Sequence, residues 1–440
     1  MTDTQPRYRA ITLSNVSKFP QWETLEPELR EAVETVARVL PFRTNAYLMD
    51  ELIDWDRVPN DPIFQLTFPQ REMLKDDQYA RVRDAIAGEA GKDEMNAVVN
   101  EIRMELNPHP AGQMTHNVPH INGEPIPGMQ HKYRETALFF PSQGQTCHAY
   151  CTFCFRWAQF VGMDGLKFAN KEAEQLGQYV SQHREITDVL FTGGDPMVMK
   201  AKVFEKYVEQ LLEIDHVRTI RIGSKSLAYW PQRFVSDADA DDMLRLFERI
   251  VAAGKQVAFM AHCSHPVEFD PEIARTAISR IRSTGANIRM QSPVIRHVND
   301  DPMAWRDMWI TGTRLGMIPY YMFVERDTGA KNYFEMPLER CWEIFREAYQ
   351  RVPGTARTVR GPSMSCHPGK VHMLGITEVA GEKAFMLEFL QARKPELVRQ
   401  PFFAKYDGSA TWFDQLEPLT QSDVPFFQRD LETVDLRVSV

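Results

Sequence analysis

The chain has 440 residues, of which 43% are hydrophobic and 25% are charged, and its formal net charge is −9 at pH 7. This composition is typical of a globular protein with one large domain or two to three smaller ones. The negative charge argues against nonspecific nucleic-acid binding, and no apolar run is long enough to cross a bilayer. The polar first residues do not resemble a signal peptide, and the cysteine pattern suits a reducing cytosol, so we expect a cytoplasmic protein.

Residues 1–133 are predicted to form a helical N-terminal region. Apolar residues recur at helical spacing in three segments: 25–39, 70–87 and 93–106. The stretch that follows, up to residue 129, is rich in Pro, Gly, Asn and His, which predicts a loop. Met114, His116 and His120 lie in this loop, and we interpret them as packed or solvated residues rather than as metal ligands.

A different sequence pattern begins near residue 134 and continues to residue 351. Short apolar runs that predict strands alternate there with amphipathic helical patterns. The predicted strands are 137–140, 188–191, 219–222, 257–260, 287–290 and 318–323. Six strand–helix units in sequence favour a parallel sheet with helices outside it, and right-handed crossovers would curl the sheet into an open or partial (β/α)6 barrel. Catalytic residues are then expected in the loops at the C-terminal ends of the strands.

Residues 352–440 form the third expected part of the chain. Its first half is interrupted by Pro and Gly and contains Lys370. The tail from residue 387 carries several aromatic residues among prolines, and we interpret it as a strap packed on the domain or on another subunit. A homo-oligomer is therefore one expected assembly. The tail has no cysteine, so it cannot provide ligands for an additional iron–sulfur cluster.

Cys147, Cys151 and Cys154 lie within eight residues, directly after the first predicted strand. A four-iron cluster normally takes four thiolates, so three local cysteines would leave one iron open to another ligand. Structural zinc normally requires four ligands in two pairs, and the remaining cysteines are scattered. His148 lies inside the motif, so zinc or chance clustering remains an alternative to a [4Fe-4S] cluster.

The CxxxCxxC spacing resembles that of the radical S-adenosylmethionine (SAM) superfamily, whose members have the partial-barrel fold. In that superfamily SAM fills the vacant iron position and is cleaved to a 5′-deoxyadenosyl radical. A flavodoxin or ferredoxin would supply the electron. Gly193, Gly194 and Asp195 follow the second predicted strand, and the resemblance implies that they contact the SAM amino group.

Further motifs resemble the lysine 2,3-aminomutase family over about residues 130–380. They are, in chain order, RIGS at 221–224, PQR at 231–233, HxxHP at 262–266, QS at 291–292 and VND at 298–300. The resemblance implies that Ser224, His262 and Gln291 line the cofactor site. It also implies a SAM-dependent enzyme that uses pyridoxal 5′-phosphate (PLP) to move an amino group to the neighbouring carbon.

The same resemblance assigns the remaining site residues. Lys370 matches the lysine that holds PLP covalently, and Lys132 and Tyr133 match residues that bind the PLP phosphate. Arg156, two residues after the last cysteine of the motif, matches an arginine that holds the substrate carboxylate, to which a guanidinium can bind through two hydrogen bonds.

The expected substrate is a free α-amino acid. Family members that act on lysine use two acids to bind its distal ammonium group; one is expected within 325–327, and the other falls at Ser363, which is no acid. Arg326, Arg357 and Arg360 would instead suit an acidic or polar side chain. Two other functions remain open: another radical SAM modification of an amino acid or peptide, with or without PLP, and a non-catalytic zinc or iron–sulfur scaffold.

Overall fold

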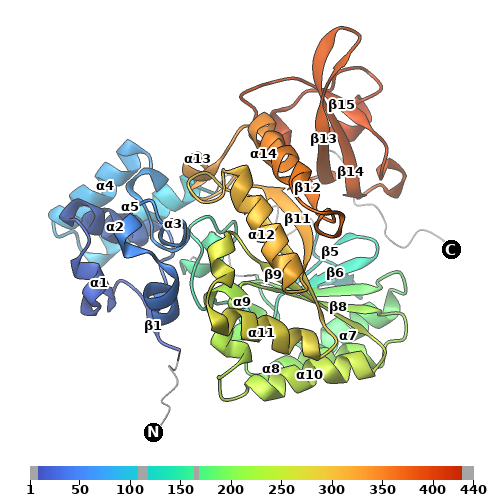
Figure 1. The fold of residues 1–440 in the computed structure, drawn as a ribbon, viewed down its shortest axis with the longest axis horizontal. Coiled ribbons are helices and arrows are strands. Elements are labelled where there is room, and N and C mark those ends of the chain that lie inside the picture. The colour runs from blue at the N-terminus through green and yellow to red at the C-terminus, as the bar shows by residue number, and fades with distance from the viewer. Residues whose placement is uncertain (1–7, 108–116, 163–167, 429–440) are drawn as a thin grey trace.

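The computed structural model describes residues 8–107, 117–162 and 168–428 of the chain. Its centre is a mixed sheet of eleven strands in the order β15-β14-β13-β12-β11-β10-β9-β8-β7-β6-β5. Helices cover one face of the sheet, and the N-terminal helices form a separate layer beside it (Figure 1). The fold is thus of the mixed α/β class, as predicted.

The secondary structure has the following bounds. The strands are β1 (Ala10–Ile11), β2 (Thr44–Asn45), β3 (His120–Ile121), β4 (Glu124–Pro125), β5 (Met129–Tyr133), β6 (Thr136–Phe139), β7 (Asp188–Phe191), β8 (Thr219–Ser224), β9 (Gln256–His262), β10 (Asn287–Val294), β11 (Ile318–Val324), β12 (Arg360–Ser365), β13 (Gly369–Val379), β14 (Glu382–Ala392) and β15 (Phe402–Lys405). The helices are α1 (Pro20–Glu23), α2 (Pro27–Val39), α3 (Pro62–Thr67), α4 (Asp76–Ala87), α5 (Lys92–Glu105), α7 (Ala173–Gln182), α8 (Ala201–Leu212), α9 (Ser226–Tyr229), α10 (Ala240–Ala252), α11 (Glu272–Ser283), α12 (Pro302–Arg314), α13 (Lys331–Phe334), α14 (Leu338–Gln350) and α15 (Val424–Phe427).

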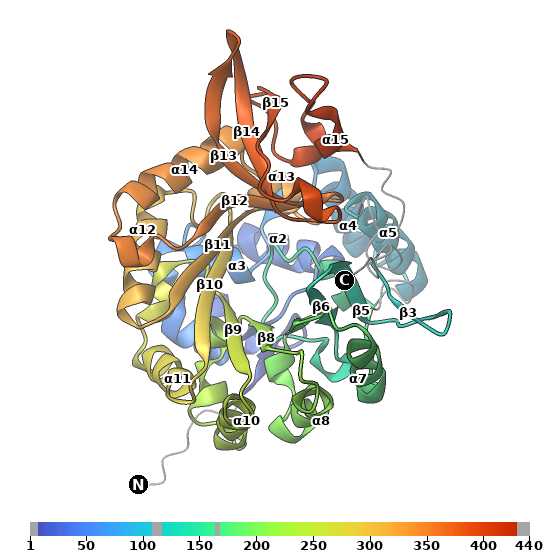
Figure 2. The ribbon, with the colours of Figure 1, turned by 90° about the vertical axis from the view of Figure 1, so that its right-hand side faces the viewer.

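All six predicted strands form, as β6 to β11, and each pairs in parallel with the next along the chain. A further parallel strand, β12, joins β11, and β5 joins β6 in the antiparallel sense. The strands follow an arc, and α7, α8, α10, α11 and α12 lie on its outer side (Figure 2). Alternation along β8 explains this arrangement, because Ile220 and Ile222 are buried in the core while Arg221 points to the other face of the sheet.

The C-terminal region differs from the predicted strap. Strands β13, β14 and β15 pair in the antiparallel sense and extend the same sheet beyond β12. The expected aromatic packing is present: Phe402 stacks on Phe426 at 4.5 Å, and Phe413 stacks on Phe427 at 5.0 Å. The strap prediction was wrong because backbone pairing with β12 continues the sheet, and Pro395 and Pro401 lie between β14 and β15.

The N-terminal region forms the predicted helices as α2, α4 and α5, although α4 begins at Asp76, after a short 3-10 turn. These helices pack in a hydrophobic core of their own, which also includes Trp157 and Trp230 of the sheet domain. The predicted loop before β5 contains a small hairpin that begins at His120, whereas Met114 and His116 lie outside the described residues. No helix within the described ranges has the length and apolar character needed to traverse a lipid bilayer.

Candidate active site

The three-cysteine loop follows β6 and is held by the N-terminal region. The Tyr150 N–H donates to the Arg43 carbonyl, and the Thr152 N–H donates to the Leu66 carbonyl, each at 2.9 Å. The Arg43 guanidinium donates in return to Thr146 Oγ1 at 2.6 Å and to the Cys147 carbonyl at 3.1 Å. The region before residue 133 therefore fixes the backbone of this loop as well as covering one side of the sheet.

The Cys147, Cys151 and Cys154 thiols are half-buried and form no disulfide. Burial raises the pKa of Cys151 to about 11 and that of Cys154 to about 12, so thiolates would need a metal to stabilise them. Within the described part of the chain, no three His, Cys, Asp or Glu side chains converge on a position for a single metal ion. His148 is buried and engaged: its Nδ1 lies 3.1 Å from Ser226 Oγ.

Gly193 and Gly194 allow the loop after β7 to pack directly on the residues before Cys147. A Cβ atom at Gly193, whose φ is +135°, would lie 2.1 Å from Gln145 Nε2, and one at Gly194 would lie 2.5 Å from the Thr146 backbone. The Asp195 N–H donates to the Thr146 carbonyl at 2.7 Å. A side chain at Gly194 would push the loops apart, because Cβ atoms do not approach backbone atoms so closely, and the positive φ of Gly193 disfavours other residues there.

Asp195 and Ser224, both predicted to line the cofactor site, contact each other. The buried Asp195 carboxylate accepts hydrogen bonds from Ser224 Oγ at 2.8 Å and from the N–H groups of Lys225 and Met197, each at 2.9 Å. Burial raises the pKa of Asp195 although these donors act against it. The carboxylate therefore joins the C-terminal ends of β7 and β8.

His262 lies at the end of β9 and Gln291 lies near the end of β10, and their side chains are in contact. The Gln291 Nε2 lies 2.9 Å from His262 Nε2. Burial and the Lys225 charge lower the pKa of His262 to about 4, so its ring is neutral near pH 7 and can accept from the amide. The structure therefore brings together the residues predicted at the ends of the second to fifth strands.

Lys370 lies at the start of β13, and its Nζ is 4.3 Å from the ring centroid of Tyr321 and 5.7 Å from that of Phe323. No carboxylate of the described residues forms an ion pair with it. Burial, together with Arg221 and Arg360, lowers the pKa of Lys370 to about 7. A large fraction of this amine is thus neutral near neutral pH, as a lysine nucleophile requires.

Lys132, Tyr133 and Arg156 lie on the β5–β6 side of the sheet. The Lys132 ammonium donates to the Cys366 carbonyl and lies 5.2 Å from the Tyr133 ring centroid. Burial is the main cause that lowers the pKa of Lys132 to about 7. The Arg156 guanidinium lies 4.3 Å from the Phe140 ring centroid, and no described carboxylate pairs with it. The Arg156 guanidinium is therefore available as a cation, whereas the Lys132 amine is only partly charged near pH 7.

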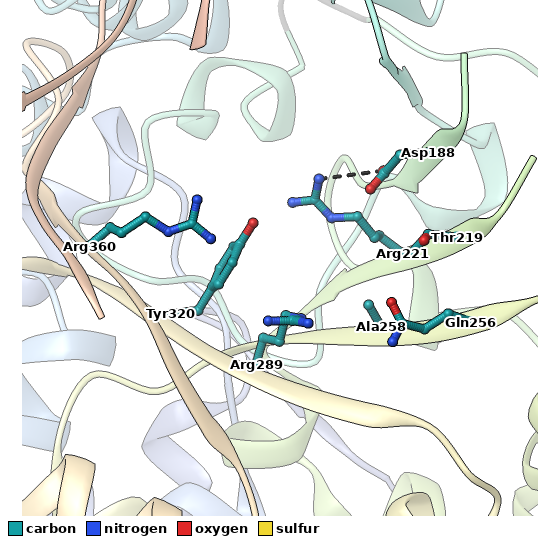
Figure 3. Close-up of a pocket in the computed structure, with 8 residues that line it drawn as sticks. All are labelled: Asp188, Thr219, Arg221, Gln256, Ala258, Arg289, Tyr320 and Arg360. Atoms are coloured by element: carbon teal, nitrogen blue, oxygen red, sulfur yellow. Dashed lines mark hydrogen bonds and ion pairs between the residues drawn. The ribbon is translucent and has the colours of Figure 1, made fainter. Parts of the chain in front are cut away.

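The residues considered for the substrate side chain separate in the structure. Glu325 is buried, which raises its pKa well above the usual range, and Ser363 is buried and donates to the Met322 carbonyl at 3.4 Å. Arg357 is exposed and binds the Val352 carbonyl, and Arg326 binds the Ser365 carbonyl. Arg360 is also exposed, and it lines a cavity beside the sheet (Figure 3).

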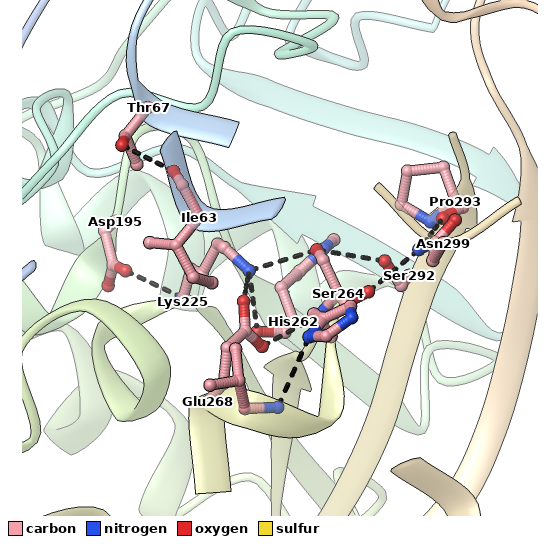
Figure 4. A network of polar contacts seen from close by, with 12 residues as sticks. Ile63, Thr67, Asp195, Lys225, His262, Ser264, Glu268, Ser292, Pro293 and Asn299 are labelled. Carbon is pink, nitrogen blue, oxygen red and sulfur yellow. Dashed lines mark hydrogen bonds and ion pairs between the residues drawn. The ribbon is translucent and has the colours of Figure 1, made fainter. Parts of the chain in front are cut away.

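A buried ion pair between Lys225 and Glu268 lies next to His262 and was not predicted from the sequence. Lys225 Nζ lies 2.9 Å from Glu268 Oε1 and 3.1 Å from Ser264 Oγ (Figure 4). Burial disfavours the Lys225 charge, but Glu268 outweighs it and the pKa of Lys225 is raised. Asn299 continues the network by donating to the Ser264 carbonyl at 2.9 Å. The RIGSK run could have drawn attention to Lys225, whereas no sequence signal marks Glu268.

The chain is similar to several curated proteins, although no protein-family profile matches it. A candidate L-lysine 2,3-aminomutase of Aquifex aeolicus is 31% identical over 398 residues, which are 90% of this chain and 93% of that protein. The L-lysine 2,3-aminomutase of Escherichia coli is 29% identical over 52% of this chain and 63% of that enzyme. The L-lysine 2,3-aminomutase of Acetoanaerobium sticklandii is 24% identical over 77% of this chain and 70% of that enzyme.

Among solved structures, that of Streptococcus suis SuiB bound to S-adenosylmethionine is similar at a TM-score of 0.36 and 10% identity. The likeness covers 61% of this chain and 56% of that one, and it is too weak to assign a fold or a function. The assignment follows instead from the Aquifex relative, which is similar along nearly its whole length. The chain therefore belongs to the lysine 2,3-aminomutase-like family of radical SAM enzymes.

Proposed function

We propose that the protein is a PLP-dependent radical SAM isomerase that moves the amino group of a free α-amino acid between its α and β carbons. The observation that carries the proposal is Lys370. It is a shielded lysine without an ion-pair partner among the described residues, with a pKa near 7, on the strand next to the parallel sheet. A lysine in this state suits a covalent bond to an aldehyde cofactor.

The proposal assigns the three-cysteine loop to a [4Fe-4S] cluster with SAM on its open iron. When bound, this pair supplies a 5′-deoxyadenosyl radical that takes a hydrogen atom from the substrate. The chain contributes a loop whose backbone the N-terminal region fixes, and the glycines after β7 bring Asp195 against Thr146. The donor set suits such a cluster, because three thiols lie on one short loop and Cys263, Cys341 and Cys366 are buried elsewhere.

The arc of parallel strands is interpreted as the partial (β/α)6 barrel of this family. The predicted SAM residues lie at or after the C-terminal ends of β7, β8, β9 and near that of β10, where such folds carry catalytic groups. In this proposal the chain is divided into three parts: a helical region over 1–133, a barrel over 134–351 and a PLP-lysine segment with a C-terminal extension over 352–440. The proposal also includes a cytoplasmic location and a flavodoxin or ferredoxin as reductant. A homo-oligomer is the proposed assembly.

Lys370, Lys132, Tyr133 and Arg156 are assigned to PLP and the substrate. When bound, PLP supplies the conjugated ring that stabilises a radical during amino-group migration. Lys370 would hold the cofactor, and Lys132 and Tyr133 would bind its phosphate. Arg156 has no acidic partner among the described residues and would orient the substrate carboxylate through two hydrogen bonds.

A turnover experiment tests this function. The anaerobically reconstituted full chain, with PLP, SAM and dithionite, is incubated with a panel of amino acids, and the products are separated by chromatography and mass spectrometry. The proposal predicts a β-amino acid of unchanged mass from at least one substrate, and loss of that product in Lys370→Ala. SAM cleavage that is independent of Lys370 and of PLP would favour another radical SAM modification instead.

A further inference from the structure

An arginine-rich cavity lies at the N-terminal ends of the parallel strands, opposite the end that carries the cysteine loop. Its volume is about 170 Å³. It is lined by Asp188, Thr219, Arg221, Gln256, Ala258, Arg289, Tyr320 and Arg360, which come from six consecutive strands, β7 to β12 (Figure 3). None of these residues takes part in holding the cluster or SAM in the function proposed above.

The charges in this cavity do not balance. Asp188 pairs with Arg221, with its Oδ1 3.4 Å from Arg221 Nη1. Arg289 and Arg360 pack on Tyr320 at 5.2 and 4.7 Å from its ring centroid, and neither forms an ion pair with a carboxylate of the described residues. The residues that line the cavity thus carry three guanidinium groups and one carboxylate. Guanidinium groups placed together in this way favour a bound carboxylate or phosphate.

The cavity adjoins Lys370. The Lys370 Nζ lies 4.3 Å from the Tyr321 ring centroid, and the Arg360 Cζ lies 5.1 Å from the same centroid. Figure 3 shows the guanidinium groups of Arg221 and Arg360 pointing toward each other across the Tyr320 hydroxyl. A substrate held near Lys370, with its α-carboxylate at Arg156, could therefore extend its side chain toward Arg360.

Among the residues that line the cavity, Asp188 is the one carboxylate that could bind a positively charged side chain, and it is paired with Arg221. The position of the second acid is Ser363, whose hydroxyl faces the Met322 carbonyl. Glu325 is buried, and burial raises the pKa of its carboxyl well above the usual range. A distal ammonium group would meet three arginines and a single carboxylate that is already paired with one of them, which costs electrostatic free energy.

We propose that this arginine cavity binds the side-chain carboxylate of the substrate, so the enzyme acts on an acidic α-amino acid rather than on lysine. The inference rests on the proposed function, which it makes more specific. Arg289 and Arg360 are the residues that determine this specificity. Arg221 is already neutralised by Asp188 and is expected to contribute less.

Calorimetric titration of the cluster-reconstituted, PLP-loaded full chain tests the inference without turnover. Two matched pairs of probes separate charge from size: glutamate with glutamine, and 2-aminoadipate with lysine. At least one acidic member is expected to bind ten times or more tightly than its partner. Arg289→Gln and Arg360→Gln should each weaken binding of that acid about tenfold and leave binding of the neutral partner within twofold. Arg357→Gln is the matched control, because Arg357 is exposed and binds backbone carbonyls outside the cavity.

The remaining outcomes would overturn the inference. Tighter binding of lysine than of 2-aminoadipate is one of them. A second is saturation of the cavity by inorganic phosphate while amino acids bind unchanged, which would make it a separate anion site. A third is loss of PLP absorbance in Arg360→Gln, which would assign the cavity to the cofactor phosphate. Failure of the proposed function looks different: no amino acid yields a β-amino acid, whatever binds to the cavity.

Discussion

The two ends of the parallel strands are built on opposite electrostatic principles. At the C-terminal end, two buried charged groups have partners: the Asp195 carboxylate receives three donors, and Lys225 is paired with Glu268. At the N-terminal end, three arginines share one carboxylate, Asp188, among the residues that line the cavity. Satisfied buried networks rigidify a site, whereas clustered arginines repel one another until an anion binds between them.

The same strands serve both ends. On β10, Arg289 faces the cavity and Gln291, two residues later, meets His262. Side chains two apart on a strand share a face, so one stripe of polar residues runs from the arginine cavity toward the cysteine loop. Lys370 reaches this stripe from β13, between its ends. The C-terminal end of the strands is therefore rigid, with its hydrogen-bonding groups paired within the chain, whereas the N-terminal end has a cavity suited to an anionic ligand.

Removing a ligand of the proposed cluster should have the largest effect at the rigid end. Cys147→Ala, Cys151→Ala or Cys154→Ala should abolish iron binding and reductive SAM cleavage, because three thiolates are needed to leave one iron open. Iron analysis and 5′-deoxyadenosine formation measure this. Cys341→Ala, a buried cysteine outside the loop, is the control. Full SAM cleavage by any of the three variants would contradict the cluster assignment.

Breaking the buried ion pair should be the next largest effect. Lys225→Met leaves the Glu268 carboxylate buried without its cation, which should lower the free energy of unfolding by about 3–5 kcal/mol. Urea denaturation measures the change. Lys383→Met removes an exposed pair with Glu339 and should leave the unfolding midpoint unchanged. Equal midpoints for both variants would show that the rigid end does not depend on this pair.

Loosening the cysteine loop from the N-terminal region should have a moderate effect. Arg43→Met removes the hydrogen bonds to Thr146 and Cys147, and we expect a loss of about 1–3 kcal/mol in unfolding free energy. Iron should also be released faster to a chelator. Arg71→Met, whose exposed partner is Asp76, serves as comparison. Iron retention identical to that of the unchanged protein would mean that the loop holds its shape alone.

The Lys370 amine should show the smallest of these effects, as a pH dependence. Its pKa of about 7 lies below the 10.5 of an ordinary lysine, so its acylation should reach half its maximal rate near pH 7. Between these two pH values the unfolded chain binds more protons, so this residue also makes stability rise with pH. Peptide mass spectrometry compares the acylation rate of Lys370 with that of Lys383, whose pKa is raised by its hydrogen bond to Glu339. Parallel profiles for both lysines would contradict the shielding of Lys370.

Much of the sheet domain could be predicted from the sequence. The short apolar runs of the six strands and the helices between them follow from local periodicity, and the strand ends place Asp195, Ser224, His262 and Gln291 in one region. The spacing of the three cysteines is local as well. These features depend on residues close together in the chain, which is why pattern alone reveals them.

The features that escaped prediction depend on distant residues. Glu268 meets Lys225 across 43 positions, and Arg289 and Arg360 both pack on Tyr320 only because β10, β11 and β12 lie side by side. Asp195 stays a predicted contact of the SAM amino group, and what was not predicted are the three donors that its carboxylate receives from the chain itself. Strands β13 to β15 were missed because their pairing partners are set by the whole sheet, and strand propensity depends on such context.

The most direct test of the account is borohydride reduction of the anaerobically purified, cluster-reconstituted protein with saturating PLP, followed by peptide mass spectrometry. The account predicts a phosphopyridoxyl mass on the peptide that contains Lys370, and none on that peptide in Lys370→Ala. An intact cluster with no adduct on Lys370, or with the adduct on another lysine, would contradict the assignment of Lys370 and with it the proposed aminomutase chemistry.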